Sequence, residues 1–274
     1  MLSLRGSSRS SAIFKPLLAF QRKPLLISPR NLSRSSPRRN LCFSLKPSDR
    51  NGLTSASSTS ETYVLDDTPM SGMEDVLVSY IFGKKRATEV AHSVWKLVVK
   101  KGDTVIDATC GNGYDTLALL KMVSDELGRG CVYAMDIQKD AIVNTNSLLE
   151  ESVNANERDL VKLLPICHSE LDKVVPEKAS VRLVAFNLGF LPGGDKAIIT
   201  KPETTLLALE AAKETVMPGG LISLVVYVGH PGGWQEWETI QAFASGLPVD
   251  EWVCCKFQIL NKPWAPIPVF LFKR

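Results

Sequence analysis

The sequence predicts an α/β protein built on a doubly wound, mostly parallel sheet that ends in an antiparallel hairpin. From residue 87 onward, short apolar or β-branched runs alternate with longer runs of helical spacing. Such alternation is typical of a parallel sheet covered by helices on both faces. The last two apolar runs, 252–260 and 269–272, have no helical run between them, so we expect them to pair as a hairpin.

Each element follows from one of the two periodicities. A helix is expected at 87–99, where apolar side chains recur every three or four residues. Pro202 suits the first turn of a later helix, and Pro218-Gly219-Gly220 predicts its end. The remaining strands are expected at residues 104–108, 131–135, 161–167, 181–186 and 221–228, and the helices at 73–82, 115–127, 139–151, 171–175, 202–217 and 234–246.

The N-terminal segment has a different composition. Residues 1–48 contain no Asp or Glu and are rich in Ser and Arg, which is typical of a mitochondrial or chloroplast transit peptide. A basic tail that binds nucleic acid is the alternative. We expect residues 1–60 to be a transit peptide and linker, 61–85 an N-terminal arm, and 86–274 the folded domain. The chloroplast is the preferred destination, and the mitochondrion stays open.

Charge and cysteine content exclude several classes of protein. Residues 1–60 hold eleven Lys/Arg and one acid, Asp49, and so carry +10, which leaves −7 on residues 61–274 from the total of +3. The domain is therefore no general nucleic-acid coater, and RNA binding would need a local patch. None of the six cysteines forms a CxxC pair, so we expect free thiols and no metal site. No apolar run reaches the roughly 18 residues of a membrane span.

The loop after the first strand is the first candidate binding site. It runs from Asp107 through Gly111 and Gly113 to Thr116, and ligands of such sheets bind at the carboxyl ends of the strands. A dinucleotide-binding fingerprint would have a third Gly in place of Thr116. The pattern D-x-x-x-G-x-G instead predicts binding of S-adenosylmethionine (SAM). An ordinary tight turn is the alternative for this loop taken alone.

The next two strand ends strengthen that interpretation. Asp136 lies 23 residues after Gly113, close to the spacing of an acid that accepts the ribose hydroxyls. Gln138 would help to hold the ribose or adenine, and His168 and Ser169 would lie at the adenine edge. His168 taken alone is more often a structural histidine. The strand order, the loop and the acid together predict the class I SAM-dependent methyltransferase fold, whose last strand is antiparallel.

Two further strand ends carry candidate catalytic residues. Asn187 and Phe190 keep the first and last positions of the (Asn/Asp)-Pro-Pro-(Tyr/Phe) pattern of enzymes that methylate exocyclic amines. The Asn would accept amine hydrogens, and the aromatic ring would stack on the substrate. Tyr227 and His230, within a Gly/Pro-rich stretch, would meet the substrate from the opposite wall. The alternatives are a strand cap, loop packing and a plain turn.

Five motifs give the chain a family resemblance over residues 87–274. They resemble the YtqB/MnmM-type methyltransferases, whose older label is rRNA methylase, and read DATCGNGYDT, YAMDIQKDAI, FNLGFLPGGDK, TKPETT and VVYVGHPGG. The resemblance implies an organellar enzyme of bacterial descent. It implies methyl transfer from SAM to the aminomethyl nitrogen of 5-aminomethyl-2-thiouridine at the tRNA wobble position, with the anticodon stem-loop as substrate. A homodimer stays open.

The resemblance also implies which residues contact the cofactor. They are Asn112, Asp115, Asp136, Gln138, His168 and Ser169, and the sequence departs from the family at Tyr114, where His is expected. Three other functions remain as alternatives: an rRNA methyltransferase, an NAD(P)-linked oxidoreductase on a similar sheet, and a non-catalytic RNA-binding module. The missing third Gly and the terminal hairpin argue against the oxidoreductase. Asp136 and Asn187 argue against the binding module.

Overall fold

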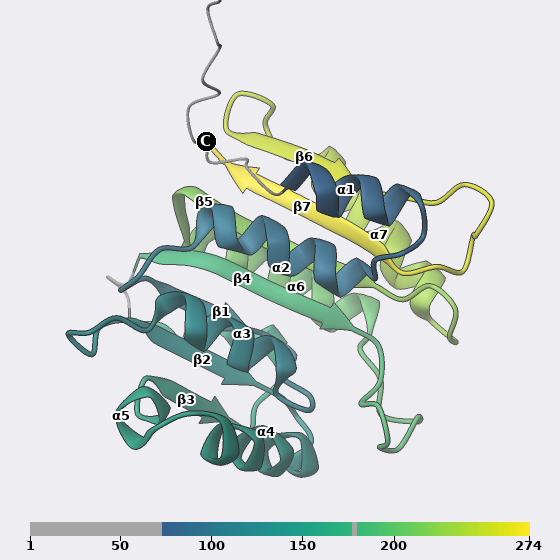
Figure 1. The fold of residues 1–274 in the computed structure, drawn as a ribbon. Coiled ribbons are helices and arrows are strands. Elements are labelled where there is room, and N and C mark those ends of the chain that lie inside the picture. The colour runs from purple at the N-terminus through teal and green to yellow at the C-terminus, as the bar shows by residue number, and fades with distance from the viewer. Residues whose placement is uncertain (1–72, 177–179) are drawn as a thin grey trace, which may run out of the picture. The chain divides into compact units, whose positions relative to one another are not determined.

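A computed structural model of the chain describes residues 73–176 and 180–274. The expected transit peptide, the linker and the first part of the arm lie outside these residues. The described part holds a seven-stranded sheet (Figure 1). Its strands are β1 (Thr104–Asp107), β2 (Cys131–Met135), β3 (Val161–Leu164), β4 (Val181–Leu188), β5 (Val216–Val226), β6 (Trp252–Lys256) and β7 (Ile267–Lys273).

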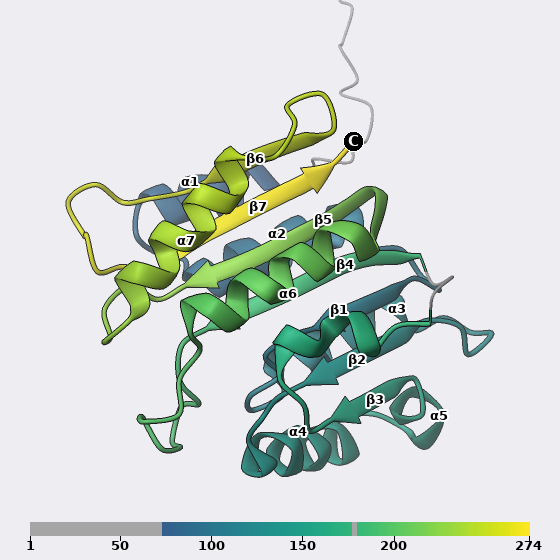
Figure 2. The ribbon, with the colours of Figure 1, turned by 180° about the vertical axis from the view of Figure 1, so that it is seen from behind.

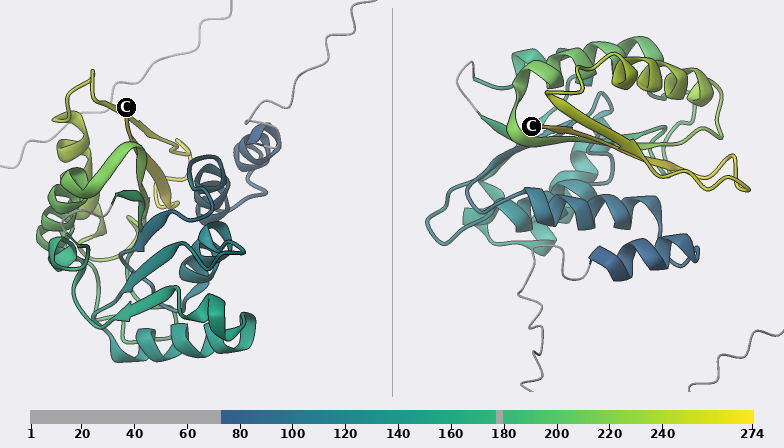
Figure 3. Two further views of the ribbon diagram at one scale, coloured as in Figure 1. Left: turned by 90° about the vertical axis from the view of Figure 1, so that its left-hand side faces the viewer. Right: turned by 90° about the horizontal axis from the view of Figure 1, so that it is seen from above.

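Helices cover both faces of the sheet, as Figures 1 and 2 show from opposite sides and Figure 3 from its end and from above. One face carries the first helices of the chain: α1 (Met73–Ile81), α2 (Ala87–Val98), α3 (Tyr114–Val123) and α4 (Lys139–Ser152), which a short α5 (Ala155–Arg158) follows. The other face carries the 3-10 helix η1 (His168–Lys173) with α6 (Pro202–Thr215) and α7 (Gly233–Ser245). This is the predicted doubly wound arrangement.

The strand order is β3-β2-β1-β4-β5-β7-β6, and β7 alone runs antiparallel to β5, with β6 antiparallel to β7. The chain moves outward from β1 through β2 to β3, then returns to the other side of β1 at β4. The order therefore reverses between β1 and β4, and ligands of open α/β sheets bind at such a switch point. The predicted terminal hairpin is confirmed.

The core consists of two apolar clusters, one on each face of the sheet. The side chains of α2 and α3 pack with one face of β1, β4 and β5, and those of α6 and α7 pack with the other. Trp95 of α2 is fully buried, and its indole N–H donates to the Ser223 hydroxyl on β5 at 2.8 Å. This bond satisfies the polar end of a buried Trp and fixes where α2 lies over the sheet.

The prediction that Pro218-Gly219-Gly220 ends a helix is wrong. The helix ends at Thr215, and these three residues lie inside β5. The register with β4 shifts here, Gly219 has φ +76°, and a Cβ on Gly220 would lie 2.7 Å from Val216 Cγ1. The glycines therefore allow a β-bulge in a continuous strand. The helix after β1 and the strands β3 and β6 are also shorter than expected, and α5 was missed.

Within the described ranges, no helix combines the length and apolar character that a membrane span requires.

Candidate active site

Asp107 anchors the loop that follows β1. Its buried carboxylate accepts the Thr116 hydroxyl at 2.6 Å and the Thr109 backbone N–H at 3.2 Å. Burial, with the nearby charge of Asp115, raises the pKa of Asp107 to about 7. Both carboxylate oxygens therefore form hydrogen bonds to residues of the loop, and Asp107 stabilises the conformation of the predicted cofactor site.

Gly111 and Gly113 give the loop after β1 a backbone conformation that other residues rarely adopt. Both have positive φ, +52° at Gly111 and +84° at Gly113. A Cβ on Gly113 would lie 2.9 Å from the Cα of Thr145 on α4. The Thr145 hydroxyl also donates to the Gly111 carbonyl at 3.0 Å. Gly113 thus permits the close packing of α4 against this loop.

Asp136 lies at the end of β2 and faces this loop. One carboxylate oxygen accepts the Gly111 N–H at 3.1 Å, and the other accepts the Gln138 N–H at 2.9 Å. Each oxygen has a further lone pair for a ligand hydroxyl. Burial raises the pKa of Asp136. An oriented, partly buried carboxylate at the carboxyl end of β2, the neighbour of β1, fits the two ribose hydroxyls of SAM.

Both polar atoms of the Asn112 side-chain amide form hydrogen bonds within the protein. Its Nδ2 donates to the Pro192 carbonyl at 3.0 Å, and its Oδ1 accepts from Asn144 Nδ2 at 2.9 Å. Asn112 therefore connects the loop after β1 to the loop after β4 and to α4. Direct cofactor contact by its side chain remains a prediction, and the geometry adds a bridging role.

His168 is buried at the start of η1. Its Nε2 lies 3.1 Å from the Thr204 hydroxyl of α6, and its ring meets Phe186 edge-on at 6.1 Å. Burial lowers the pKa of His168 to about 4, so the ring is neutral at physiological pH. Ser169 follows it and is half-buried. The role of both residues at the adenine edge stays a prediction, and His168 also joins η1 to α6.

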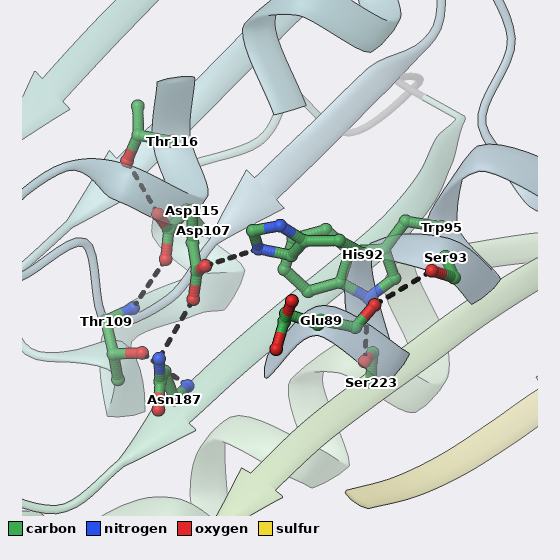
Figure 4. A network of polar contacts seen from close by, with 10 residues as sticks. All are labelled: Glu89, His92, Ser93, Trp95, Asp107, Thr109, Asp115, Thr116, Asn187 and Ser223. Atoms are coloured by element: carbon green, nitrogen blue, oxygen red, sulfur yellow. Dashed lines mark hydrogen bonds and ion pairs between the residues drawn. The ribbon is translucent and has the colours of Figure 1, made fainter. Parts of the chain in front are cut away.

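The central feature of the site is a chain of three polar side chains from three elements (Figure 4). Asn187 of β4 donates through Nδ2 to Asp115 Oδ2 at 3.0 Å, and the other oxygen of Asp115 lies 2.6 Å from His92 Nε2. A carboxylate can only accept, so the NH₂ end of the Asn187 amide must face Asp115. Among the described residues the Asn187 carbonyl oxygen then has no hydrogen-bond donor, so it can accept a hydrogen bond from a ligand at the end of β4.

Sequence reasoning missed His92. Its ring packs against that of Trp95, with centroids 4.6 Å apart and the ring planes tilted by 40°, and Trp95 is fixed by Ser223. One feature of the sequence could have indicated it. The chain has only three histidines, and the other two, His168 and His230, were already candidates at strand ends. The packing of α2 brings His92 to the same edge of the sheet.

The opposite wall is formed by the loops after β4 and β5. Phe190 is 38% exposed, and its ring meets that of His230 edge-on at 6.5 Å. The Nδ1 of His230 lies 3.0 Å from the Pro231 carbonyl, which requires a proton on Nδ1. Its Nε2 is then an acceptor, and it is buried without a hydrogen-bond partner in the described part of the chain. Tyr227 beside it is partly exposed, and burial raises its pKa.

A buried carboxylate supports the loop that carries Phe190. Glu236 of α7 accepts the hydroxyls of Thr200 at 2.9 Å and Thr205 at 2.6 Å. Thr200 in turn accepts the Gly189 N–H at 3.0 Å. Glu236 therefore fixes the backbone between Asn187 and Phe190, and sequence reasoning missed it because it reads as an ordinary helix residue.

Comparisons with known proteins identify the family of the chain. Residues 132–273 match the family model described as "Putative rRNA methylase". The chain is 58% identical over 243 residues to a protein of Arabidopsis thaliana named "tRNA (mnm(5)s(2)U34)-methyltransferase, chloroplastic". That match covers 88% of this chain and 87% of the relative.

Two solved structures resemble the chain along almost their whole length. An rRNA-methylase-type protein of Clostridium thermocellum is 38% identical with a TM-score of 0.64, over 69% of this chain and 98% of that one. A methyltransferase of Streptococcus mutans, solved with S-adenosylhomocysteine, is 32% identical with a TM-score of 0.60, over 69% and 99%. The chain belongs to this "Putative rRNA methylase" family of SAM-dependent class I methyltransferases.

Proposed function

We propose that the protein transfers a methyl group from SAM to the aminomethyl nitrogen of 5-aminomethyl-2-thiouridine at the wobble position of tRNA. The observation that carries this proposal is the orientation of Asn187. Asp115 accepts a hydrogen bond from the NH₂ group of Asn187, which leaves the carbonyl oxygen of Asn187 for a ligand. Asn187 lies at the carboxyl end of β4, next to β1, whose following loop is the predicted cofactor site. The name of the Arabidopsis relative supports the same substrate.

The chemistry requires a neutral, oriented amine. SAM supplies the electrophilic methyl group and leaves as S-adenosylhomocysteine, and Asp136 with the loop after β1 would hold its ribose. The Asn187 oxygen accepts one N–H of the amine and so directs the lone pair toward the methyl carbon. Positioning of this kind contributes much of the rate enhancement in group transfer.

The aminomethyl group is mostly protonated near neutral pH and must lose one proton before transfer. The Nε2 of His230, at the opposite wall, has no hydrogen-bond partner in the described part of the chain, and we assign it this proton. The neutral amine then forms the new carbon–nitrogen bond, and the methylated product is again a cation. Phe190 supplies an exposed aromatic face on which the uracil ring can stack.

The proposal includes the anticodon stem-loop as the recognised part of the tRNA and the chloroplast as its location. The acid-free, Ser/Arg-rich residues 1–48 and the chloroplastic relative support that location. A homodimer remains a separate prediction, which light scattering on the purified protein would test.

The test is methyl transfer from labelled SAM to tRNA that bears 5-aminomethyl-2-thiouridine, with mass spectrometry of the nucleosides. The wild-type enzyme should produce the methylaminomethyl nucleoside, and Asn187→Ala should reduce the single-turnover rate about a hundredfold without weakening SAM binding. Label that appears in rRNA and not in tRNA would favour the rRNA alternative. Wild-type rates for Asn187→Ala would remove the proposed role of that residue.

A further inference from the structure

We infer that a basic rim beside the active site binds the phosphate backbone of the tRNA next to the target nucleotide. The rim consists of Lys84, Lys85 and Arg86, in the turn between α1 and α2, together with Lys262 and Trp264 in the loop between β6 and β7. This inference rests on the proposed function and adds to it the surface that recognises the RNA.

The two segments are far apart in sequence but adjacent in the fold. A Cβ on Gly83 would lie 3.8 Å from Lys262 Nζ. The end of α1 and residues 256–259 line one shallow groove, with Tyr80 and Ile81 on one side and Phe257 on the other. Figure 1 and the right-hand view of Figure 3 show the turn and the loop at the same end of the sheet.

The rim borders the catalytic wall. A Cβ on Gly229 would lie 3.9 Å from the Cβ of Trp264, so the β6–β7 loop lies against the strand end that carries Tyr227 and His230. The positive charge of Arg86 is close enough to Tyr227 to oppose the rise of its pKa that burial causes. The rim therefore lies next to the proposed amine site.

Its chemistry matches a single-stranded nucleic acid. Trp264 is 68% exposed, and the side chain of Arg86 is 85% exposed. Residues 257–266 contain no acid, although residues 61–274 as a whole carry −7. Glu89 of α2 pairs with Lys85 at 3.1 Å and with Arg86 at 3.6 Å, whereas Lys84 and Lys262 form no such ion pair among the described residues. Lysine and arginine bind phosphates, and an exposed indole provides a stacking face for an unpaired base. An anticodon loop offers both groups on either side of the wobble nucleotide.

The electrostatic part is tested with a labelled anticodon stem-loop RNA in a fluorescence anisotropy titration. Lys84→Ala/Lys262→Ala should weaken binding about tenfold near 0.15 M salt, and should reduce the salt slope by about 0.7 per lost phosphate contact. The matched control is Lys96→Ala/Lys121→Ala, two exposed lysines near the C-terminal ends of α2 and α3. If both double variants weaken RNA binding equally, or if Lys84→Ala/Lys262→Ala does not weaken it, the proposal that the rim binds RNA is wrong.

The stacking part is tested with Trp264. Replacement by Ala should weaken binding of the same RNA roughly five- to 150-fold, and Phe should restore most of it. Binding of an acidic protein to the rim, with no binding of the RNA, would also overturn the inference. Affinity for SAM, measured by calorimetry, should be unchanged in every rim variant. If the wild-type enzyme binds the RNA through the rim but transfers no methyl group to it, the proposed function fails and the rim stands.

Discussion

Substitution of His92 tests whether a residue outside the reacting groups controls the geometry of Asn187. His92→Ala removes the 2.6 Å contact to Asp115 Oδ1. The Asp115 carboxylate can then rotate, and the Asn187 amide loses its fixed orientation. We expect a larger loss in the rate of methyl transfer than in affinity for SAM, because Asp136, the proposed ribose-binding carboxylate, is not part of this chain of contacts, whereas Asp115 is a predicted cofactor contact.

The size of the effect follows from the contact that is lost. A hydrogen bond to a charged group contributes about 1.5–3 kcal/mol. The side chains of His92 and Asp115 are 28% and 13% exposed, so water replaces part of the contact and the lower figure applies. About 1.5 kcal/mol corresponds to a roughly tenfold slower single-turnover rate. Gln can donate to Asp115 in place of the ring, so His92→Gln should recover part of the rate.

The assay is single-turnover kinetics on aminomethyl-uridine tRNA together with a SAM titration. The matched control is Ser93→Ala, which removes a hydroxyl that donates only to the Glu89 carbonyl of the same helix. If His92 acts through Asn187, the double variant His92→Ala/Asn187→Ala should be no slower than Asn187→Ala alone. A further tenfold loss in the double variant would refute this reasoning.

Three other predictions concern Asp136, the N-terminal segment and His168. Asp136→Ala should abolish tight SAM binding, since each charge-assisted hydrogen bond to the ribose contributes on the order of 1.5–3 kcal/mol; unchanged affinity by calorimetry contradicts it. Removal of residues 1–61 should leave the folded enzyme's rate in vitro unchanged, and a lower rate would show that they do more than target the protein. The pKa of His168 is about 4 in the fold, below its usual 6.5. Its contribution to stability is therefore complete above pH 6.5 and is lost as the pH falls toward 4, by up to roughly 3 kcal/mol. Urea denaturation at both ends of that range should show a smaller drop for His168→Gln, and an equal drop would contradict the assignment.

Residues at strand ends were predictable because the carboxyl ends of parallel strands meet at one edge of a sheet. The positions of Asp136 and Asn187 follow from that rule and from the alternation of strands and helices. Local signals failed where pairing with distant strands decides the conformation. Pro218-Gly219-Gly220 reads as a helix stop, yet pairing with β4 extends the strand through these residues as a bulge. The four-residue α5 is too short for any helical periodicity to show.

The sequence by itself determined the class I fold, the D-x-x-x-G-x-G loop, the acid after β2 and the family. Each of these depends on local spacing or on the order of elements along the chain. Only the tertiary structure decided how the site residues are held. Asp115 lies 23 residues from His92 and 72 from Asn187. His92 reaches Asp115 because Trp95 fixes α2 to Ser223, 128 residues away. Contacts between elements so far apart in sequence depend on packing. The apolar periodicity of an element shows that one of its faces is buried, but it does not specify which side chains of other elements it meets.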